Sequence, residues 1–254
     1  MFHRLRLLHK RRSTQAFGGT ARIETGSPWR EANGGDCSLS CRLWALILLD
    51  SMIMKNSSRS SCDTGIGALG PIAWGSHFCN FYRTQGDLAE CIVPFFEKAL
   101  AENEMGIWIT SDPLDQREAK RLLGQRVPDL SAREASGQML ILDFADWYLD
   151  PKGSVTAEAL CTALDRLAAA EQRGFVGIRM TANSFWLERK YWALFSEYEQ
   201  KVQAAVRNSR IVVLCSYSLD RCTARDVLEV LAHHDFALAR HERGWQRIES
   251  STLA

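Results

Sequence analysis

The stretch "SHFCNFYRTQGDLAECIVPFFEKALAENE", residues 76–104, predicts a short strand, a polar turn and then a helix. The strand is expected over 77–82. The helix is expected over 87–103, because apolar residues recur there at spacings of three and four behind an Asp87 N-cap. Pro94 falls inside this helix and is expected to kink it or to move its start later.

The turn between the strand and the helix, a frequent ligand site in α/β proteins, reads Arg83-Thr84-Gln85-Gly86-Asp87. A phosphate-binding loop uses several glycines to expose backbone N–H groups, and its lysine reaches the β- and γ-phosphates. This turn has one glycine and no lysine. The sequence therefore disfavours a nucleoside triphosphate at this position.

Outward from this stretch, β-rich runs alternate with helical patterns. Further strands are predicted over 105–110, 139–144, 175–181 and 210–217. Helices are predicted behind a Ser111 or Asp112 cap, over 156–174, over 185–208 and over 223–234, with a closing hairpin over 236–249 that turns at Arg243-Gly244. This alternation predicts an α/β domain over 71–254, with a doubly wound, mainly parallel sheet of about five to seven strands and helices on both faces.

Residues 1–70 lack such a pattern. The start is basic, and the apolar run "LWALILL" (43–49) is far shorter than the ~20 residues that span a bilayer. We expect a disordered or mistranslated leader, with Met52 or Met54 as the true start. No membrane association is expected.

Charge and cysteine content exclude further classes. Residues 1–74 carry ten Lys or Arg against five Asp or Glu, whereas residues 75–254 carry 21 against 25, so the predicted domain is mildly acidic. That balance argues against nucleic-acid binding. The eight cysteines are irregularly spaced, with no C-x-x-C pair and no H-E-x-x-H motif. We therefore expect reduced thiols, a cytoplasmic protein, and neither a metal nor another cofactor.

Polar and aromatic residues gather where the predicted strands end, and in a parallel sheet these carboxyl ends share one edge. Each alone is typical of a cap or turn, but together they predict a ligand pocket. The residues at or just beyond the strand ends are Tyr82, Thr110, Ser111, Asp112, Asp143, Trp147, Tyr148, Asn183, Trp186, Tyr217, Asp220 and Arg221.

Arg179 and His77 complete the candidate ligand-binding set. Arg179 lies within strand 175–181, where it either points outward from an edge strand or pairs with one of three carboxylates, Asp112, Asp143 or Asp220. His77 and the pair His233-His234 are candidates for ligands, bases or hydrogen-bonded structural residues.

Catalysis has less support. Cys215 and Cys222 flank the last strand-end loop, but no histidine or lysine is assigned beside either thiol. The sequence contains no G-x-S-x-G motif and no distinguishable pair of catalytic carboxylates. No catalytic residues are predicted.

A series of segments resembles one family. The sequence segments "HFCNFY", "PFFEKALAENEMGIWITSDPL", "DWYL", "GFVGIRMTANSFWLE", "CSYSLDRC" and "HHDFAL", in this order, are similar to the MEDS domain of methanogen/methylotroph DcmR-type sensory proteins. The resemblance runs from about His77 to Glu249. It implies a RecA/KaiC-like fold without the phosphate loop, and a sensor of small organic molecules such as hydrocarbon derivatives.

Members of that family are often fused to a histidine kinase or a DNA-binding domain, and neither pattern occurs in this sequence. The resemblance therefore implies a non-enzymatic sensor that signals to a separate protein, such as a histidine kinase or transcription regulator, or to a second copy of itself. Two alternatives remain: a degenerate nucleotide-binding protein with Asp112 or Asp143 on a metal, and a ligand-free interaction module that uses an apolar face of helix 185–208.

Overall fold

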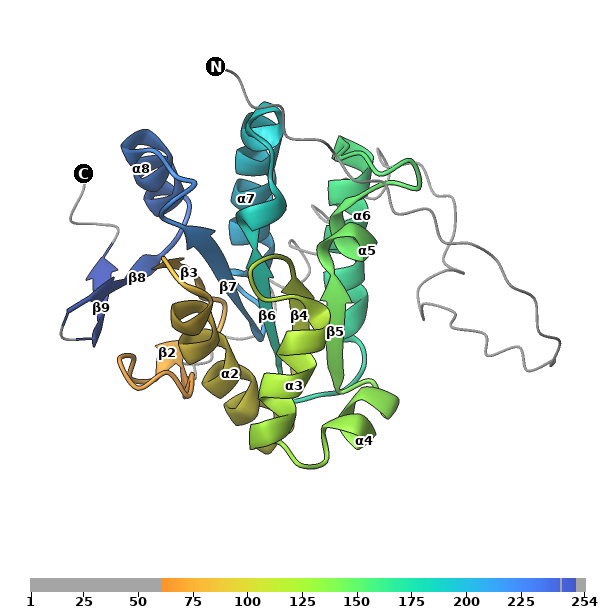
Figure 1. Ribbon diagram of the computed structural model, residues 1–254. Coiled ribbons are helices and arrows are strands. Elements are labelled where there is room, and N and C mark those ends of the chain that lie inside the picture. Colours follow the sequence, from red (N-terminus) through yellow and green to blue (C-terminus); the bar gives the residue numbers. More distant parts are fainter. Residues whose placement is uncertain (1–60, 243, 250–254) are drawn as a thin grey trace, which may run out of the picture. The chain divides into compact units, whose positions relative to one another are not determined.

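The structure, a computed structural model, describes residues 61–242 and 244–249 (Figure 1). The expected leader and the alternative starts at Met52 and Met54 lie outside the described residues. Among the described residues, no helix has the length and apolar character needed to cross a membrane.

The described residues include a small hairpin that begins before the predicted boundary at residue 71. Strand β1 (Ser61–Cys62) pairs antiparallel with β2 (Ile72–Ala73), and the loop between them buries Ile66 and Leu69. Gly65 in this loop has φ +74°, and a Cβ there would lie 2.4 Å from the carbonyl oxygen of Pro94. The loop is thus packed closely against the following helix.

The main sheet of the described residues has seven strands in the order β5-β4-β6-β7-β3-β8-β9. All neighbours are parallel except the β8–β9 hairpin. This confirms the predicted α/β class with a mainly parallel sheet. The strands are β3 (His77–Tyr82), β4 (Met105–Thr110), β5 (Met139–Asp143), β6 (Ile178–Asn183), β7 (Ile211–Ser218), β8 (Phe236–His241) and β9 (Gly244–Glu249).

Helices cover both faces of the sheet. They are α2 (Gln85–Ala101), α3 (Gln116–Arg126), α4 (Leu130–Ala135), α5 (Phe144–Tyr148), α6 (Ala157–Glu171), α7 (Trp192–Val206) and α8 (Ala224–Ala232). Side chains alternate along β3, so Phe78 contacts Phe95 of α2 while the preceding His77 contacts Gln203 of α7. Helices α2 and α3 lie side by side on the face to which Phe78 points (Figure 1), and α6 packs beside α7.

Several predicted helix boundaries needed correction. Helix α2 starts at Gln85 behind an N-cap Thr84, with Asp87 as the third residue of a capping box, and it runs through Pro94. Helix α3 is capped by Asp115 rather than by Ser111 or Asp112.

The region predicted as one helix over 185–208 is also divided. Two short 3₁₀ helices, Ser184–Trp186 and Arg189–Tyr191, precede α7. The short helix α4 was not predicted. These two 3₁₀ helices follow the carboxyl end of β6, at the edge of the sheet where the ligand pocket was predicted.

Candidate functional site

Side chains from three strand ends form one hydrogen-bonded group at the carboxyl edge of the sheet. The Tyr82 hydroxyl donates to Asn183 Oδ1 at 2.8 Å, and Asn183 Nδ2 donates to the carbonyl of Asp112 at 2.8 Å. The Ser111 hydroxyl donates to the Asn183 carbonyl at 3.2 Å. The side chains of Tyr82, Ser111 and Asn183 are buried, while Asp112 is exposed. These polar groups satisfy one another and fix the strand ends.

Thr110 and Asp143 bond locally at the ends of β4 and β5. The Thr110 hydroxyl donates to the Leu142 carbonyl at 2.9 Å, and the Asp143 carboxylate accepts from the backbone N–H of Ala145 at 2.9 Å. The second contact caps α5. Both side chains therefore have structural partners.

The predicted aromatic residues pack behind this edge. The ring of Trp186 stacks on Phe144 and on Tyr148, with centroids 5.1 and 5.2 Å apart. Tyr148 also meets Phe195 edge-on at 5.7 Å. Trp147 and Tyr148 are almost fully buried and Trp186 is half-buried, so this group contributes mainly to packing.

A groove of about 310 Å³ opens at the carboxyl ends of β6 and β7. The guanidinium of Arg221 lies over the ring of Phe185, 4.6 Å from its centroid. Of the predicted site residues, Arg221 is the one that lines this groove in the described part of the chain. The lining residues are Ser184, Phe185, Leu187, Arg189, Trp192, Ser218, Arg221 and Cys222.

One ion pair involves Arg189, which lines the groove, and another involves Asp220, which directly precedes the lining residue Arg221. Arg189 binds the Asp226 carboxylate through both of its terminal nitrogens, at 2.6 and 2.7 Å. The predicted residue Asp220 is exposed and lies 3.7 Å from Arg83. Arg189 is thereby held at the start of the segment that leads into α7.

The turn after β3 is closed by its own carboxylate. Asp87 Oδ2 accepts hydrogen bonds from the backbone N–H groups of Arg83 at 3.2 Å and Thr84 at 3.0 Å. Burial opposes ionisation, but the hydrogen bonds from Thr84 and Arg83 outweigh it and lower the pKa of Asp87. A carboxylate thus occupies two N–H donors of the turn in which a phosphate loop would hold its phosphate.

Arg179 lies at the opposite edge of the sheet from the predicted pocket. It is the second residue of β6, it is fully buried, and it pairs with Glu104 rather than with Asp112, Asp143 or Asp220. The reason is register: Glu104 directly precedes β4, and Arg179 stands beside Gly106 of that strand. Its other hydrogen bonds go to backbone carbonyls of Phe95 and Asp63.

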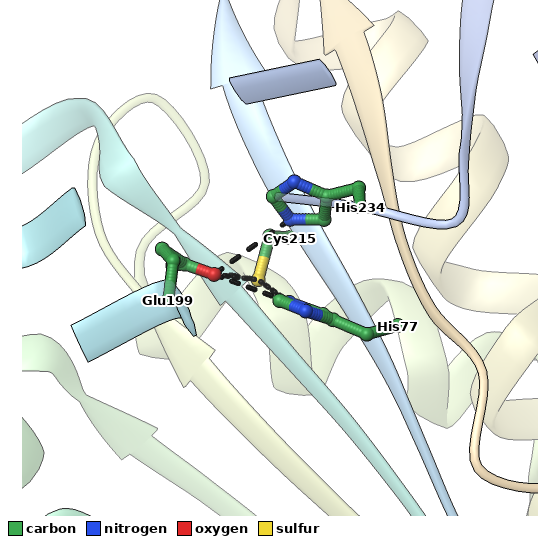
Figure 2. A group of neighbouring side chains, drawn as sticks. All are labelled: His77, Glu199, Cys215 and His234. Carbon is green, nitrogen blue, oxygen red and sulfur yellow. Dashed lines mark hydrogen bonds and ion pairs between the residues drawn. The ribbon is translucent and has the colours of Figure 1, made fainter. Parts of the chain in front are cut away.

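His77 belongs to a second, wholly buried group on the α7 face (Figure 2). His77 from β3, Glu199 from α7, Cys215 from β7 and His234 from the loop after α8 point toward one another, and their donor atoms lie within 4.8 Å of each other. His77 Nε2 lies 3.1 Å from Glu199 Oε2 and 3.3 Å from Cys215 Sγ. His234 Nε2 lies 3.7 Å from Glu199 Oε2. We call these four residues the buried cluster.

The surroundings of the buried cluster fix the direction of both histidines. The Gln203 amide donates to Asp235 at 2.8 Å, which turns its oxygen toward His77 Nδ1 at 3.0 Å. His234 Nδ1 lies 2.7 Å from the carbonyl of Val230. Each Nδ1 therefore carries the proton and donates outward, and each Nε2 faces the centre of the cluster.

Burial and the facing polar groups together set the ionisation of the buried cluster. It lowers the pKa of His234 to about 3, with His77 acting in the same direction. Burial alone would raise the pKa of Glu199, but the hydrogen bond and charge of His77 and the charge of His234 lower it overall. The pKa of Cys215 is raised well above its usual range by burial and by Glu199.

The buried cluster does not have the geometry of a catalytic triad. In a triad the nucleophile and the acid bind opposite nitrogens of the histidine, whereas here Cys215 and Glu199 both face Nε2 of His77. The other candidate thiol, Cys222, has its pKa raised to about 11 by burial and by Asp226. Neither thiol has the environment of an activated nucleophile.

A small cavity adjoins the buried cluster between α7 and α8, and Tyr217 of β7 lines it. Trp192 lines both this cavity and the groove at the carboxyl edge. The predicted residue Tyr217 therefore lies beside the buried cluster rather than in the groove. The cavity lining is Trp192, Phe195, Ser196, Glu199, Tyr217, Glu229, Val230, His233 and His234.

Sequence reasoning missed Glu199 because it stands among polar residues of an apparently ordinary amphipathic helix. The signal was present but indirect. Glu199 is buried in α7, where a carboxylate requires a partner, and Phe195 and Val202 lie on the same buried helix face.

The geometry defines an α/β domain of RecA/KaiC-like architecture in which a self-capped turn stands in place of a phosphate loop. Its fold is similar to the crystal structure of the KaiC-like protein PH0186 from the hyperthermophilic archaeon Pyrococcus horikoshii OT3, with a TM-score of 0.51 and 14% sequence identity over 75% of this chain and 86% of that chain. Residues 76–235 match the family described as the MEthanogen/methylotroph, DcmR Sensory domain. The chain belongs to this MEDS family. A search of curated proteins found no match.

Proposed function

We propose that this chain is a non-enzymatic sensory module whose groove at the carboxyl ends of β6 and β7 binds a small organic molecule. The groove itself carries the proposal: it combines the aromatic rings of Phe185 and Trp192 with the cation of Arg221 and two serine hydroxyls, Ser184 and Ser218. Aromatic walls with a few polar anchors suit a small, partly apolar ligand that bears a hydrogen-bond acceptor. Membership of a sensory-domain family supports the same role.

The signal would pass to a separate signalling protein, such as a histidine kinase or a transcription regulator, or to a second copy of the chain. Trp192 supports a route away from the groove, since it follows the 3₁₀ turn at Arg189–Tyr191 and begins α7. Its indole N–H donates to Glu229 of α8 at 3.1 Å, so a ligand that moves this ring changes a contact between two helices. A cytoplasmic location fits the free cysteines among the described residues.

The alternative of a nucleotide-binding protein has less support, because Asp87 occupies the N–H donors of Arg83 and Thr84 in the turn just before α2. The alternative of a ligand-free interaction module would need an exposed apolar face on α7. The apolar residues Phe195, Val202 and Val206 of that helix are instead buried.

A thermal-shift screen of the full chain tests the proposal. The panel comprises simple alcohols, halocarbons, methylated amines and short organic acids, with Mg-ATP as a comparison. A ligand at 100 times its dissociation constant adds about 2.7 kcal/mol to the stability of the folded state. Arg221→Ala should abolish the shift, while Arg225→Ala, an exposed arginine outside the groove, should preserve it. An equal shift in both variants, or a shift with Mg-ATP alone, would contradict the proposal.

A further inference from the structure

We propose that His77, Glu199, Cys215 and His234 bind a zinc ion, a site distinct from the groove and independent of the proposed ligand. The four donors come from two strands, one helix and one loop, and all four side chains are buried (Figure 2). Two histidine nitrogens, one thiolate and one carboxylate form a donor set that suits tetrahedral Zn²⁺.

The spacing of the donor atoms fits such an ion. With Zn–N and Zn–O bonds of about 2.1 Å and a Zn–S bond of about 2.3 Å, neighbouring donors of a tetrahedron lie roughly 3.4–3.6 Å apart. The observed separations are 3.1 Å for His77–Glu199, 3.3 Å for His77–Cys215, 3.5 Å for Cys215–Glu199 and 3.7 Å for His234–Glu199. All four donor atoms lie within 4.8 Å of one another, so shifts of up to about one ångström would complete the coordination shell.

Both histidines are in the form that binds metals. Zinc-binding histidines usually donate their second N–H to a carbonyl, an amide oxygen or a carboxylate, which fixes the tautomer and the ring orientation. His77 donates to the amide oxygen of Gln203, and His234 donates to the carbonyl of Val230. Each Nε2 is consequently free of a proton and faces the Glu199 carboxylate.

Hydrogen bonds among the four side chains do not give every buried polar atom of the cluster a partner. If His77 also carried a second proton, on Nε2, that proton and the Cys215 thiol proton could satisfy the Glu199 carboxylate, since both groups lie within reach of it. His234 Nε2 would still have no hydrogen-bond partner, although it is fully buried. A dication at the centre gives all four donors a partner.

The charges balance as well. A glutamate carboxylate and a cysteine thiolate carry two negative charges, and neutral histidines carry none. One Zn²⁺ therefore makes the buried group electrically neutral, which removes the cost of burying unpaired charge. With four protein donors the shell is closed, so we assign a structural ion that joins β3, α7, β7 and the loop after α8.

The first measurement is the metal content of the full chain purified from zinc-supplemented cells, where about one zinc per chain is expected. After removal of the metal, Co²⁺ should give the strong visible bands of a tetrahedral site together with a thiolate-to-cobalt charge-transfer band. Cys215→Ser should remove that charge-transfer band. Cys91→Ser is the matched control, because Cys91 is equally buried in α2 but lies outside the cluster, and it should keep the band.

A second variant tests the site without touching a ligand. Gln203→Leu removes the acceptor for His77 Nδ1 together with the hydrogen bond to Asp235, and it should weaken zinc binding by about 10- to 100-fold in a chelator competition. A Cys37→Ser/Cys41→Ser variant should retain the metal. Arg221→Ala should do so too, which separates this site from the proposed groove.

Three results would overturn the zinc site. The first is a folded, zinc-replete protein that carries no metal and shows no charge-transfer band with Co²⁺. The second is a metal that is lost with Cys37 and Cys41 but retained in Cys215→Ser. The third is a Gln203→Leu variant that folds and binds zinc as tightly as the unmodified chain.

Discussion

Arg179 of β6 and Glu104, which precedes β4, form a buried two-point ion pair. Arg179 Nε donates to one carboxylate oxygen at 2.5 Å and Nη2 donates to the other at 3.0 Å. Burial raises the pKa of Glu104, and the hydrogen bond from Arg179 opposes that shift. The pairing with Arg179 therefore offsets the cost of burying the negative charge of Glu104.

Replacing Arg179 should destabilise the fold rather than affect ligand response alone. Arg179→Met leaves the Glu104 carboxylate buried without its partner, and the expected loss in the free energy of unfolding is about 3–5 kcal/mol. Urea denaturation measures it. Arg179→Met combined with Glu104→Leu should recover most of that loss. A single variant as stable as the unmodified protein would show that the pair is dispensable.

Asn183 should be the more sensitive partner in the hydrogen-bonded group at the strand ends. Asn183→Leu removes the acceptor of Tyr82 and the donor to Asp112, so buried polar groups lose partners at a cost of about 2–3 kcal/mol. Tyr82→Phe removes one hydroxyl and should cost about 1 kcal/mol. Thermal denaturation of both variants compares the two losses. The reverse order of stability would contradict the central position of Asn183.

Asp226 should give the domain a measurable acid sensitivity. The hydrogen bonds from Arg189 outweigh burial, and together with those from Thr223 they hold the pKa of Asp226 well below its usual range. A depressed pKa contributes stability above the unfolded-state value of about 3.9, and that contribution disappears as the pH falls toward the folded-state value.

Urea denaturation of the unmodified chain and of Asp226→Asn, followed from neutral to acid pH, measures this contribution. The stability difference between the two should be constant near pH 7 and should shrink below about pH 4. Asp220→Asn, which removes an exposed carboxylate, is the matched control and should follow the unmodified curve. A difference that stays constant into acid would refute the assignment.

Mg-ATP should not stabilise the protein, because the turn before α2 lacks the lysine and the several glycines of a phosphate loop, and Asp87 already binds the N–H groups of Arg83 and Thr84 in that turn. Asp87→Ala removes half of the capping box and should lower stability by about 1 kcal/mol. It should still give no thermal shift with Mg-ATP. Calorimetric titration of both proteins checks this, and nucleotide binding by either one would revive the nucleotide-binding alternative.

The sheet could be predicted because its strands contain short β-rich apolar runs, such as Ile211–Cys215 at the start of β7, whose eight residues are all buried. Helix starts were harder to place. Thr84 and Asp87 both cap helices well, and the choice between them depends on a reciprocal hydrogen bond that composition does not show.

The candidate sites were only partly predictable for a related reason. Parallel topology places Tyr82, Ser111 and Asn183 at one edge, so their proximity follows from strand order. The partner of Arg179 depends on the register between β4 and β6, and the buried cluster depends on which face of α7 meets the sheet. Both are properties of packing between segments that are far apart in the sequence.

The position of β3 has a consequence for how the chain is made. This first strand of the main sheet lies between β7 and β8, so His77 meets Cys215 138 residues later and Asp235 158 residues later. Closing such long loops costs entropy before any contact repays it, and folds dominated by distant contacts assemble slowly. During synthesis, β3 leaves the ribosome with neither neighbour available, and the centre of the sheet is complete only once β8 has emerged.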